Sequence, residues 1–172
     1  MTNTATFHLI LLCAAATSLM VAAAHDVAVR TVPNRVSLIV AVAGIGMHAL
    51  DGQLAPALFG GGLVFAGCWF CWRSGWIGGG DVKLLSACAL LVPPDLVPEL
   101  VLATAIAGAV LALLYLALAR LLPTRATPQP KGLMRRVWRA EQRRIRRRLS
   151  LPYACAISAG VLLTMASSGF PG

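Results

Sequence analysis

The sequence predicts an all-α protein, a polytopic membrane bundle of about six transmembrane helices. Of its 172 residues, 58% are hydrophobic and 12% are charged, and the mean hydropathy is +0.78. Soluble domains have roughly 45–50% apolar and about 25% charged residues. This composition excludes a soluble globular domain and a disordered chain. The length gives room for about six spans of roughly 20 residues each, and we expect residues 1–172 to form one membrane-embedded domain.

Six apolar segments predict the spans by hydropathy. The fourth ends early because Pro93-Pro94 interrupts it. Glycines at 44, 46, 60–62 and 67 are expected to let neighbouring helices pack closely. The six segments are residues 7–24, 36–50, 54–72, 82–96, 97–119 and 151–170.

The net charge of +9 lies in one connection between spans. Residues 123–150 hold ten Lys or Arg against the single acid Glu141, whereas the rest of the chain has five bases and five acids. Six crossings place every basic residue on or near one side of the membrane. The positive-inside rule makes that side cytoplasmic and puts both termini on the other side.

Three interpretations of this basic segment remain open. It can be a solvated loop that fixes topology. It can also hold an amphipathic helix at Met134–Leu149, with Arg135–Arg148 on the anionic headgroups of membrane lipids. Nucleic acid is the least favoured partner for a chain this apolar, and we expect none.

The first apolar segment resembles a secretory signal peptide in its apolar run and its small residues at 22–24. However, Met1–Thr6 carries no positive charge, and Arg30 and Arg35 follow the segment. This charge order predicts a retained first helix. The five cysteines all lie in apolar stretches, so we expect packing thiols and neither a metal nor another cofactor.

Two acids at the cytoplasmic ends of spans are candidate functional residues, Asp26 after the first span and Asp81 at the start of the fourth. Burying an ionisable group at membrane depth costs free energy, so such residues are candidates for a functional role. Each also has a simpler interpretation. Asp26 can pair with Arg30 four residues on, and Asp81 can cap the fourth helix.

The sequences around the two acids are distinctive. Pro33 stops any helix that continues from the first span, and Asn34 is expected to cap the second. Gly78–Gly80 provide backbone without side-chain bulk next to Asp81, so another segment can approach closely. Lys83 is expected to extend to the membrane interface.

A pair of aspartates supports acid–base hydrolysis. Two carboxylates about 3 Å apart cannot both ionise, so they share a proton. The ionised member can activate water against a peptide carbonyl, and the protonated member can stabilise the oxyanion and protonate the leaving amine. The three histidines, His8, His25 and His48, are scattered and suggest no competing catalytic set.

Three stretches resemble the type IV prepilin leader peptidases, which are membrane aspartic proteases of the GxGD kind. The block D-x-x-x-R-x-[IV]-P-N is matched by Asp26, Arg30, Val32, Pro33 and Asn34. The block G-x-G-D-x-K is matched by Gly78, Gly80, Asp81 and Lys83. The start of the last span, Pro152–Ala154, is also similar to that family's last helix. The order of these stretches agrees over essentially the whole chain.

The resemblance implies a bacterial inner-membrane enzyme that removes a short, basic, cytoplasmic leader from prepilins, with Asp26 and Asp81 as the catalytic pair. It implies the short, stand-alone form that accompanies Tad/Flp-type pili, without the methyltransferase part of larger members. Two alternatives are a non-catalytic scaffold of a pilus or secretion apparatus and a GxGD protease with another membrane substrate.

Overall fold

The computed structural model describes residues 2–121 and 151–167, and within them all regular structure is helical. This confirms the predicted all-α class. The basic segment 123–150 lies outside the described residues. The elements are α1 (Thr2–Val29), α2 (Asn34–Leu50), α3 (Leu54–Arg73), α4 (Gly79–Leu91), the short 3-10 helix η1 (Pro94–Leu96), α5 (Val97–Leu121) and α7 (Tyr153–Ser167).

Two helix boundaries differ from the prediction and bear on the site. The predicted segment 82–96 is too long, because α4 ends at Leu91 and Val92 is extended. Pro93 favours this extended conformation in the residue before it and cannot continue the helix. The first helix, in contrast, runs past residue 24 to Val29, so that Asp26 lies within α1 rather than after it.

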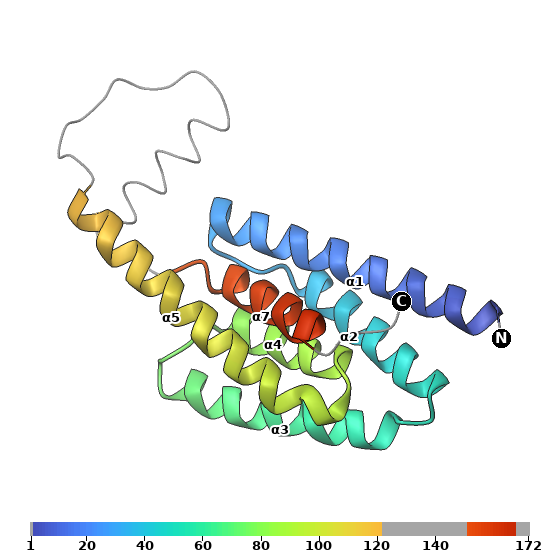
Figure 1. Cartoon of the computed structure of the whole chain (residues 1–172). Helices are drawn as coiled ribbons and strands as arrows, with labels where there is room; N and C mark the ends of the chain where they lie inside the picture. The colour runs from blue at the N-terminus through green and yellow to red at the C-terminus, as the bar shows by residue number, and fades with distance from the viewer. Residues whose placement is uncertain (1, 122–150, 168–172) are drawn as a thin grey trace.

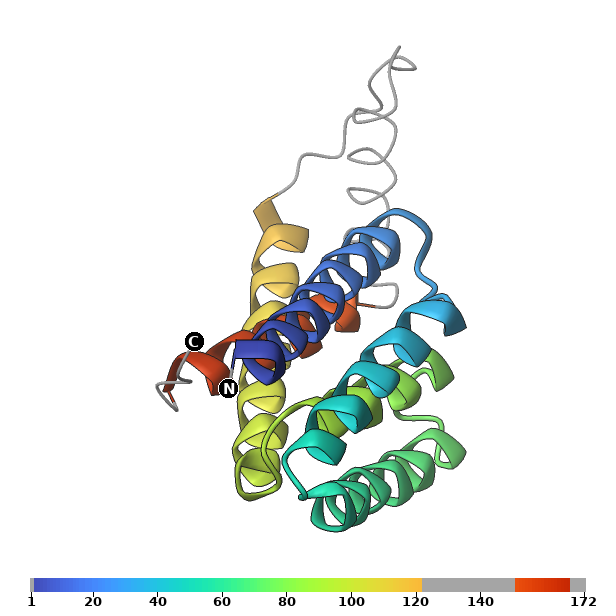
Figure 2. The ribbon, with the colours of Figure 1, turned by 90° about the vertical axis from the view of Figure 1, so that its right-hand side faces the viewer.

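Successive helices run in opposite directions along the bundle (Figures 1 and 2). The connections α1–α2 and α3–α4 and the start of α7 therefore lie at one end, which we name the Asp81 end. The turn α2–α3 around Asp51 and the connection from α4 to α5 lie at the other, which we name the Asp51 end. Chain segments far apart in sequence meet at each end.

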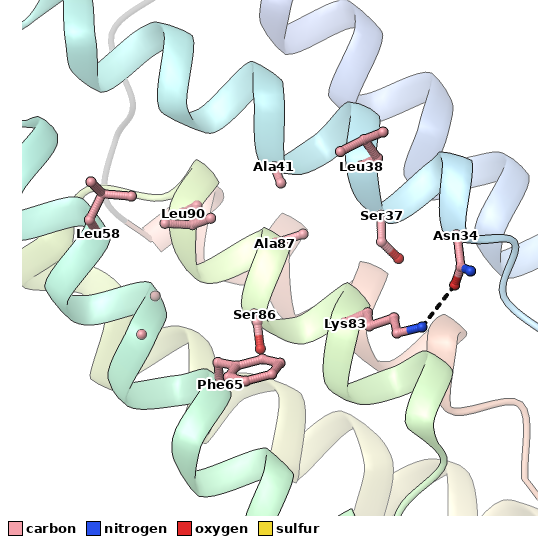
Figure 3. Close-up of a pocket in the computed structure, with 12 residues that line it drawn as sticks. Asn34, Ser37, Leu38, Ala41, Leu58, Phe65, Lys83, Ser86, Ala87 and Leu90 are labelled. Atoms are coloured by element: carbon pink, nitrogen blue, oxygen red, sulfur yellow. Dashed lines mark hydrogen bonds between the residues drawn. The ribbon is translucent and has the colours of Figure 1, made fainter.

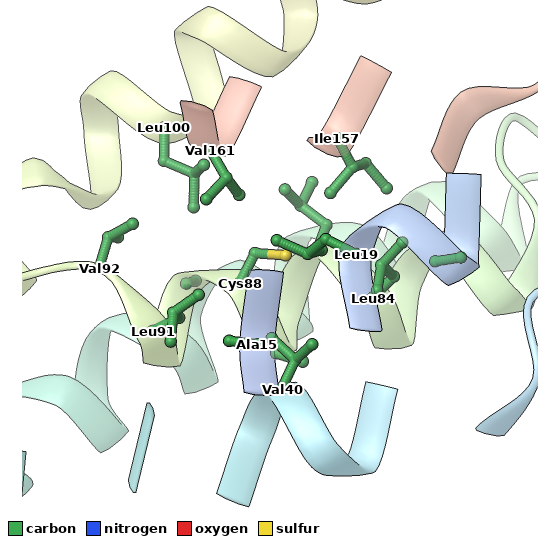
Figure 4. Packing of buried hydrophobic residues seen from close by; sticks show 14 of the residues in the cluster. Ala15, Leu19, Val40, Leu84, Cys88, Leu91, Val92, Leu100, Ile157 and Val161 are labelled. Carbon is green, nitrogen blue, oxygen red and sulfur yellow. The ribbon is translucent and has the colours of Figure 1, made fainter. Parts of the chain in front are cut away.

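Helix α4 is the centre of the bundle. It packs against α2, α3 and α7, and most of its side chains are buried. The core around it takes residues from several helices, as Figure 4 shows. The large apolar side chains of α1, α3 and α5 are instead widely exposed. The core residues labelled there include Leu19, Val40, Leu84, Cys88, Leu100 and Ile157.

The helices fall into two length classes. Thr4–Val29, Leu54–Arg73 and Pro94–Arg120 are long and apolar enough to cross a membrane, whereas Asn34–Leu50 and Tyr153–Ser167 are shorter apolar helices. Helix α4 has 13 residues, and at 1.5 Å per residue it spans about 20 Å, against about 30 Å for the hydrocarbon core. Three long apolar helices thus occur together with shorter ones and with the short, buried α4, which is consistent with a helical membrane bundle.

Close helix packing depends on some of the predicted glycines and not on others. A Cβ on Gly44 of α2 would lie 2.8 Å from the Cα of Leu91, so α2 and α4 are in backbone contact there. Gly160 of α7 would similarly place a Cβ 2.9 Å from the Cα of Thr104 in α5. At Gly62 and Gly67 of α3, an added Cβ would meet nothing within 4 Å. Those two glycines are not required for contacts among the described residues.

Candidate active site

The end of α1 places Asp26 inside the bundle, where the residue is only 6% exposed. The helix stops soon afterwards at Arg30, which has a left-handed φ of 65° and donates its N–H to the carbonyl of Asp26 over 2.9 Å. Next to the aspartate, His25 Nδ1 lies 2.6 Å from the carbonyl oxygen of Thr31. The chain therefore folds back directly beside Asp26, as the left-handed end of a helix requires.

The first turn of α7 holds the carboxylate of Asp26. The backbone N–H of Ala154 donates to Asp26 Oδ2 over 3.1 Å. Ala154 is the second residue of α7, so its N–H has no acceptor within the helix. A helix N-terminus also favours negative charge. Asp26 consequently caps a helix that is remote in sequence, and this contact stabilises its ionised form.

Asp81 lies in the first turn of α4, which begins at Gly79 after an extended Gly78. Its carboxylate accepts a hydrogen bond from the backbone of Gly78. The alternative that Asp81 caps α4 is nevertheless wrong, because Gly78 is at the N-cap and no side chain caps the helix. A Cβ on Gly78 would lie 2.9 Å from Asp81 Oδ2, so a larger residue there would displace this carboxylate. Asp81 is also close enough to Asp26 for the two carboxylates to interact electrostatically.

The two motifs that flank the aspartates are in direct contact. Lys83 Nζ donates to Asn34 Oδ1 over 3.1 Å (Figure 3). On the other side, a Cβ on Gly80 would lie 3.3 Å from the Cβ of Val32, so the glycine permits close approach of the α1–α2 connection. The prediction that Asn34 caps α2 is wrong: Pro33 is at the N-cap and no side chain caps the helix. The side-chain amide of Asn34 instead accepts the hydrogen bond from Lys83 and so connects the two motifs.

Aromatic and cationic side chains surround the pair. Tyr153, the first residue of α7, is half-buried and lies within electrostatic range of Asp81. The Arg30 guanidinium lies 5.9 Å from the centroid of the Tyr115 ring in α5, which is within cation–π range. Trp72 at the end of α3 covers Gly79, whose added Cβ would be 3.3 Å from Trp72 Nε1.

The structure brings every predicted site residue to the Asp81 end. Sequence reasoning missed the backbone of Ala154 and the ring of Tyr153 as parts of the site. The only signal for them was the resemblance of Pro152–Ala154 to a family's last helix. Within residues 2–121 and 151–167, no three His, Cys, Asp or Glu side chains gather into a group that could hold a metal ion. The chemistry that this arrangement offers is that of two unequal carboxylates.

The fold and the site define a helical membrane protein with two electrostatically interacting carboxylates at one end of its bundle. The family model of the type IV leader peptidases matches residues 13–113, a stretch that contains both aspartates. The chain belongs to this family, which is a family of proteases. Neither a curated protein nor a solved structure matches the chain.

Proposed function

We propose that the protein is an aspartic endopeptidase that cleaves the basic cytoplasmic leader from type IV, Flp-like prepilins. The observation that carries the proposal is the convergence of Asp26 and Asp81, which come from different helices and lie close enough to interact electrostatically, with Asp26 buried. Two like charges at this depth oppose folding. Without a functional role, this arrangement would only lower the stability of the protein.

The two aspartates are assigned different roles. Asp26 accepts an N–H from the first turn of α7, which favours its ionised form and suits a base that takes a proton from water. Asp81 then carries the shared proton. It donates a hydrogen bond to the oxyanion as water attacks the scissile carbonyl, and afterwards gives the proton to the leaving amine.

The charge distribution supports the orientation of the enzyme. The Asp81 end contains Lys83, Arg30 and Arg35, and it leads into the basic segment 123–150. The positive-inside rule therefore favours an active site at the cytoplasmic face of the bacterial inner membrane, with both termini on the other side. The substrate is a precursor whose apolar helix is already inserted and whose leader remains cytoplasmic. The proposal includes no methyl transfer.

The test uses a precursor with a short basic leader before its apolar helix, co-expressed with the protein. Asp26→Asn and Asp81→Asn are each expected to lower processing at least about 100-fold, because loss of the base or of the acid removes a catalytic contribution of about 10²–10⁴. Asp51→Asn at the opposite end is the matched control and is expected to process normally. Immunoblots of precursor and mature pilin measure the effect. Processing that survives in either active-site variant, with the protein inserted at the normal level, would overturn the two-aspartate mechanism.

A further inference from the structure

A groove runs along α4 on the side where α2 and α3 leave it uncovered (Figure 3). Its volume is about 470 Å³. On α4 it extends from Lys83 to Leu90, which is about two helical turns. The rims carry Leu38 of α2 and Phe65 of α3, which are 63% and 48% exposed. The groove therefore opens sideways, where apolar side chains are exposed as they are on a lipid-facing surface.

Small residues line much of this groove. Ala41 of α2, Gly62 of α3 and Ala87 of α4 each contribute to it. Gly61 is explained by packing within the chain, because its added Cβ would lie 2.7 Å from Cγ of Leu90. Gly62 is not explained in that way, since nothing lies within 4 Å of its Cβ position. Surfaces of small residues allow a further helix to approach closely in a membrane.

The groove has one polar end, and it is the end next to Asp81. Ser37 lines it and is 7% exposed, and its buried hydroxyl has no hydrogen-bond partner among the residues the structure describes. In Figure 3 this hydroxyl points from α2 toward the space between α2 and α4. Lys83 lies beside it, and one of the three N–H groups of its ammonium donates to Asn34. The polar end thus offers a positive charge and unused donors, which is complementary to a carboxylate.

We propose that this groove binds the apolar transmembrane helix of the precursor, with a carboxylate from the first turn of that helix on Lys83 and Ser37. The inference rests on the proposed function. Asp81 and Lys83 both lie near the start of α4, at the same end of the bundle. A helix in the groove with its own N-terminus at Lys83 therefore brings the segment that precedes it to the end that holds the two aspartates. A carboxylate in the first turn of a helix is additionally favoured by the helix dipole. The groove would therefore select the substrate and fix the register of cleavage.

Filling the groove tests the proposal. Gly62→Leu extends a side chain from a groove-lining position, where an added Cβ meets nothing within 4 Å among the described residues. Gly67→Leu adds the same side chain to the same helix at a position that is equally open at Cβ and does not line the groove. We expect Gly62→Leu to lower the processing rate at least tenfold, with Gly67→Leu close to the wild-type rate. Equal rates for the two variants would overturn the inference.

Photo-crosslinking tests occupancy without any need for cleavage. Benzoylphenylalanine is placed at Leu38 on the rim or, as the control, at Leu113 of α5, which is 67% exposed, in the Asp81→Asn protein. We expect the precursor to crosslink at 38 and not at 113. Crosslinks at 38 only to phospholipid or to a second copy of this chain would overturn the inference. If the wild-type protein cuts no precursor, the proposed function fails, while this crosslink still decides whether the groove holds the helix.

Discussion

Both ends of the bundle contain polar side chains that reach from one helix to another, but their pairings differ. At the Asp51 end, donors meet acceptors. His48 Nε2 bonds the carbonyl oxygen of Val92 over 3.1 Å, His8 Nε2 lies 3.1 Å from Asp51 Oδ1, and Ser167 donates to Glu99. At the Asp81 end, the carboxylates of Asp26 and Asp81 lie close enough to interact electrostatically, and both carry the same charge when ionised.

The difference separates stabilising contacts from functional ones. Complementary pairs between helices satisfy polar groups that would otherwise be unpaired in an apolar environment. The pairing of Asp26 with Asp81 instead brings two acidic groups together. Asp26 accepts a hydrogen bond from the N-terminus of α7, and Asp81 accepts one from the backbone of Gly78. We therefore expect substitutions at the Asp81 end to change activity more than stability, and those at the Asp51 end to do the opposite.

The largest effect expected from a single contact is at Ala154. Ala154→Pro removes the N–H that binds Asp26, and proline is tolerated in the first turn of a helix. It also adds ring atoms at a fully buried position and restricts the backbone of Tyr153 before it. Hydrogen bonds to charged groups contribute about 1.5–3 kcal/mol, so we expect kcat to fall by about ten- to one-hundredfold with little change in KM. Steady-state cleavage of the precursor in detergent measures both.

Ala154→Ser is the matched control for this substitution, because it changes the side chain and keeps the N–H. It is expected to cleave at close to the wild-type rate. A proline variant that cleaves normally while it folds would show that α7 does not orient Asp26. The functional difference between the two ends would then depend on the two aspartates alone.

A smaller effect, and on stability, is expected at His48. The residue is 4% exposed, and its bond to Val92 connects α2 to the end of α4. His48→Leu leaves that carbonyl unpaired and is expected to lower the free energy of unfolding by about 1–2 kcal/mol. His48→Gln can place an N–H at the same position and should recover most of the loss. Thermal unfolding in detergent measures this, and cleavage per folded molecule should stay constant.

If His48→Leu abolished cleavage and left the melting temperature unchanged, the division between the two ends would be broken. The groups at the Asp51 end would then take part in the reaction or in binding its substrate. The same result in His48→Gln would locate the requirement in the imidazole ring itself.

Much of the fold and of the site could be predicted from the sequence because its signals are local. Apolar runs predict helices, Pro33 and Pro93 predict their interruptions, and the charge of residues 123–150 orients them. Asp26 and Asp81 were predicted as a pair because ionisable residues are rare in such segments. These inferences need only the neighbours of each residue along the chain.

The rest could not be predicted because it depends on which helices are neighbours in space. No local pattern indicates that the N–H of Ala154 reaches Asp26 or that Asn34 is used by Lys83 rather than as a cap. The groove along α4 likewise exists only once α2 and α3 are placed. Packing decided the roles of individual glycines too, since Gly44 is required for contact and Gly62 is not.

The smallest effect should come from His8 and Asp51, which complete the polar contacts of the Asp51 end. Their side chains are 25% and 46% exposed, and exposed ion pairs contribute only about 0.2–1 kcal/mol because water and salt screen them. A double-mutant cycle of His8→Ala and Asp51→Ala, followed by thermal unfolding at low and high salt, measures the coupling. We expect a small coupling that declines with salt, and no change in cleavage. A coupling that is large and independent of salt would show that this pair is shielded from water, and the Asp51 end would then be held together as firmly at its surface as at His48.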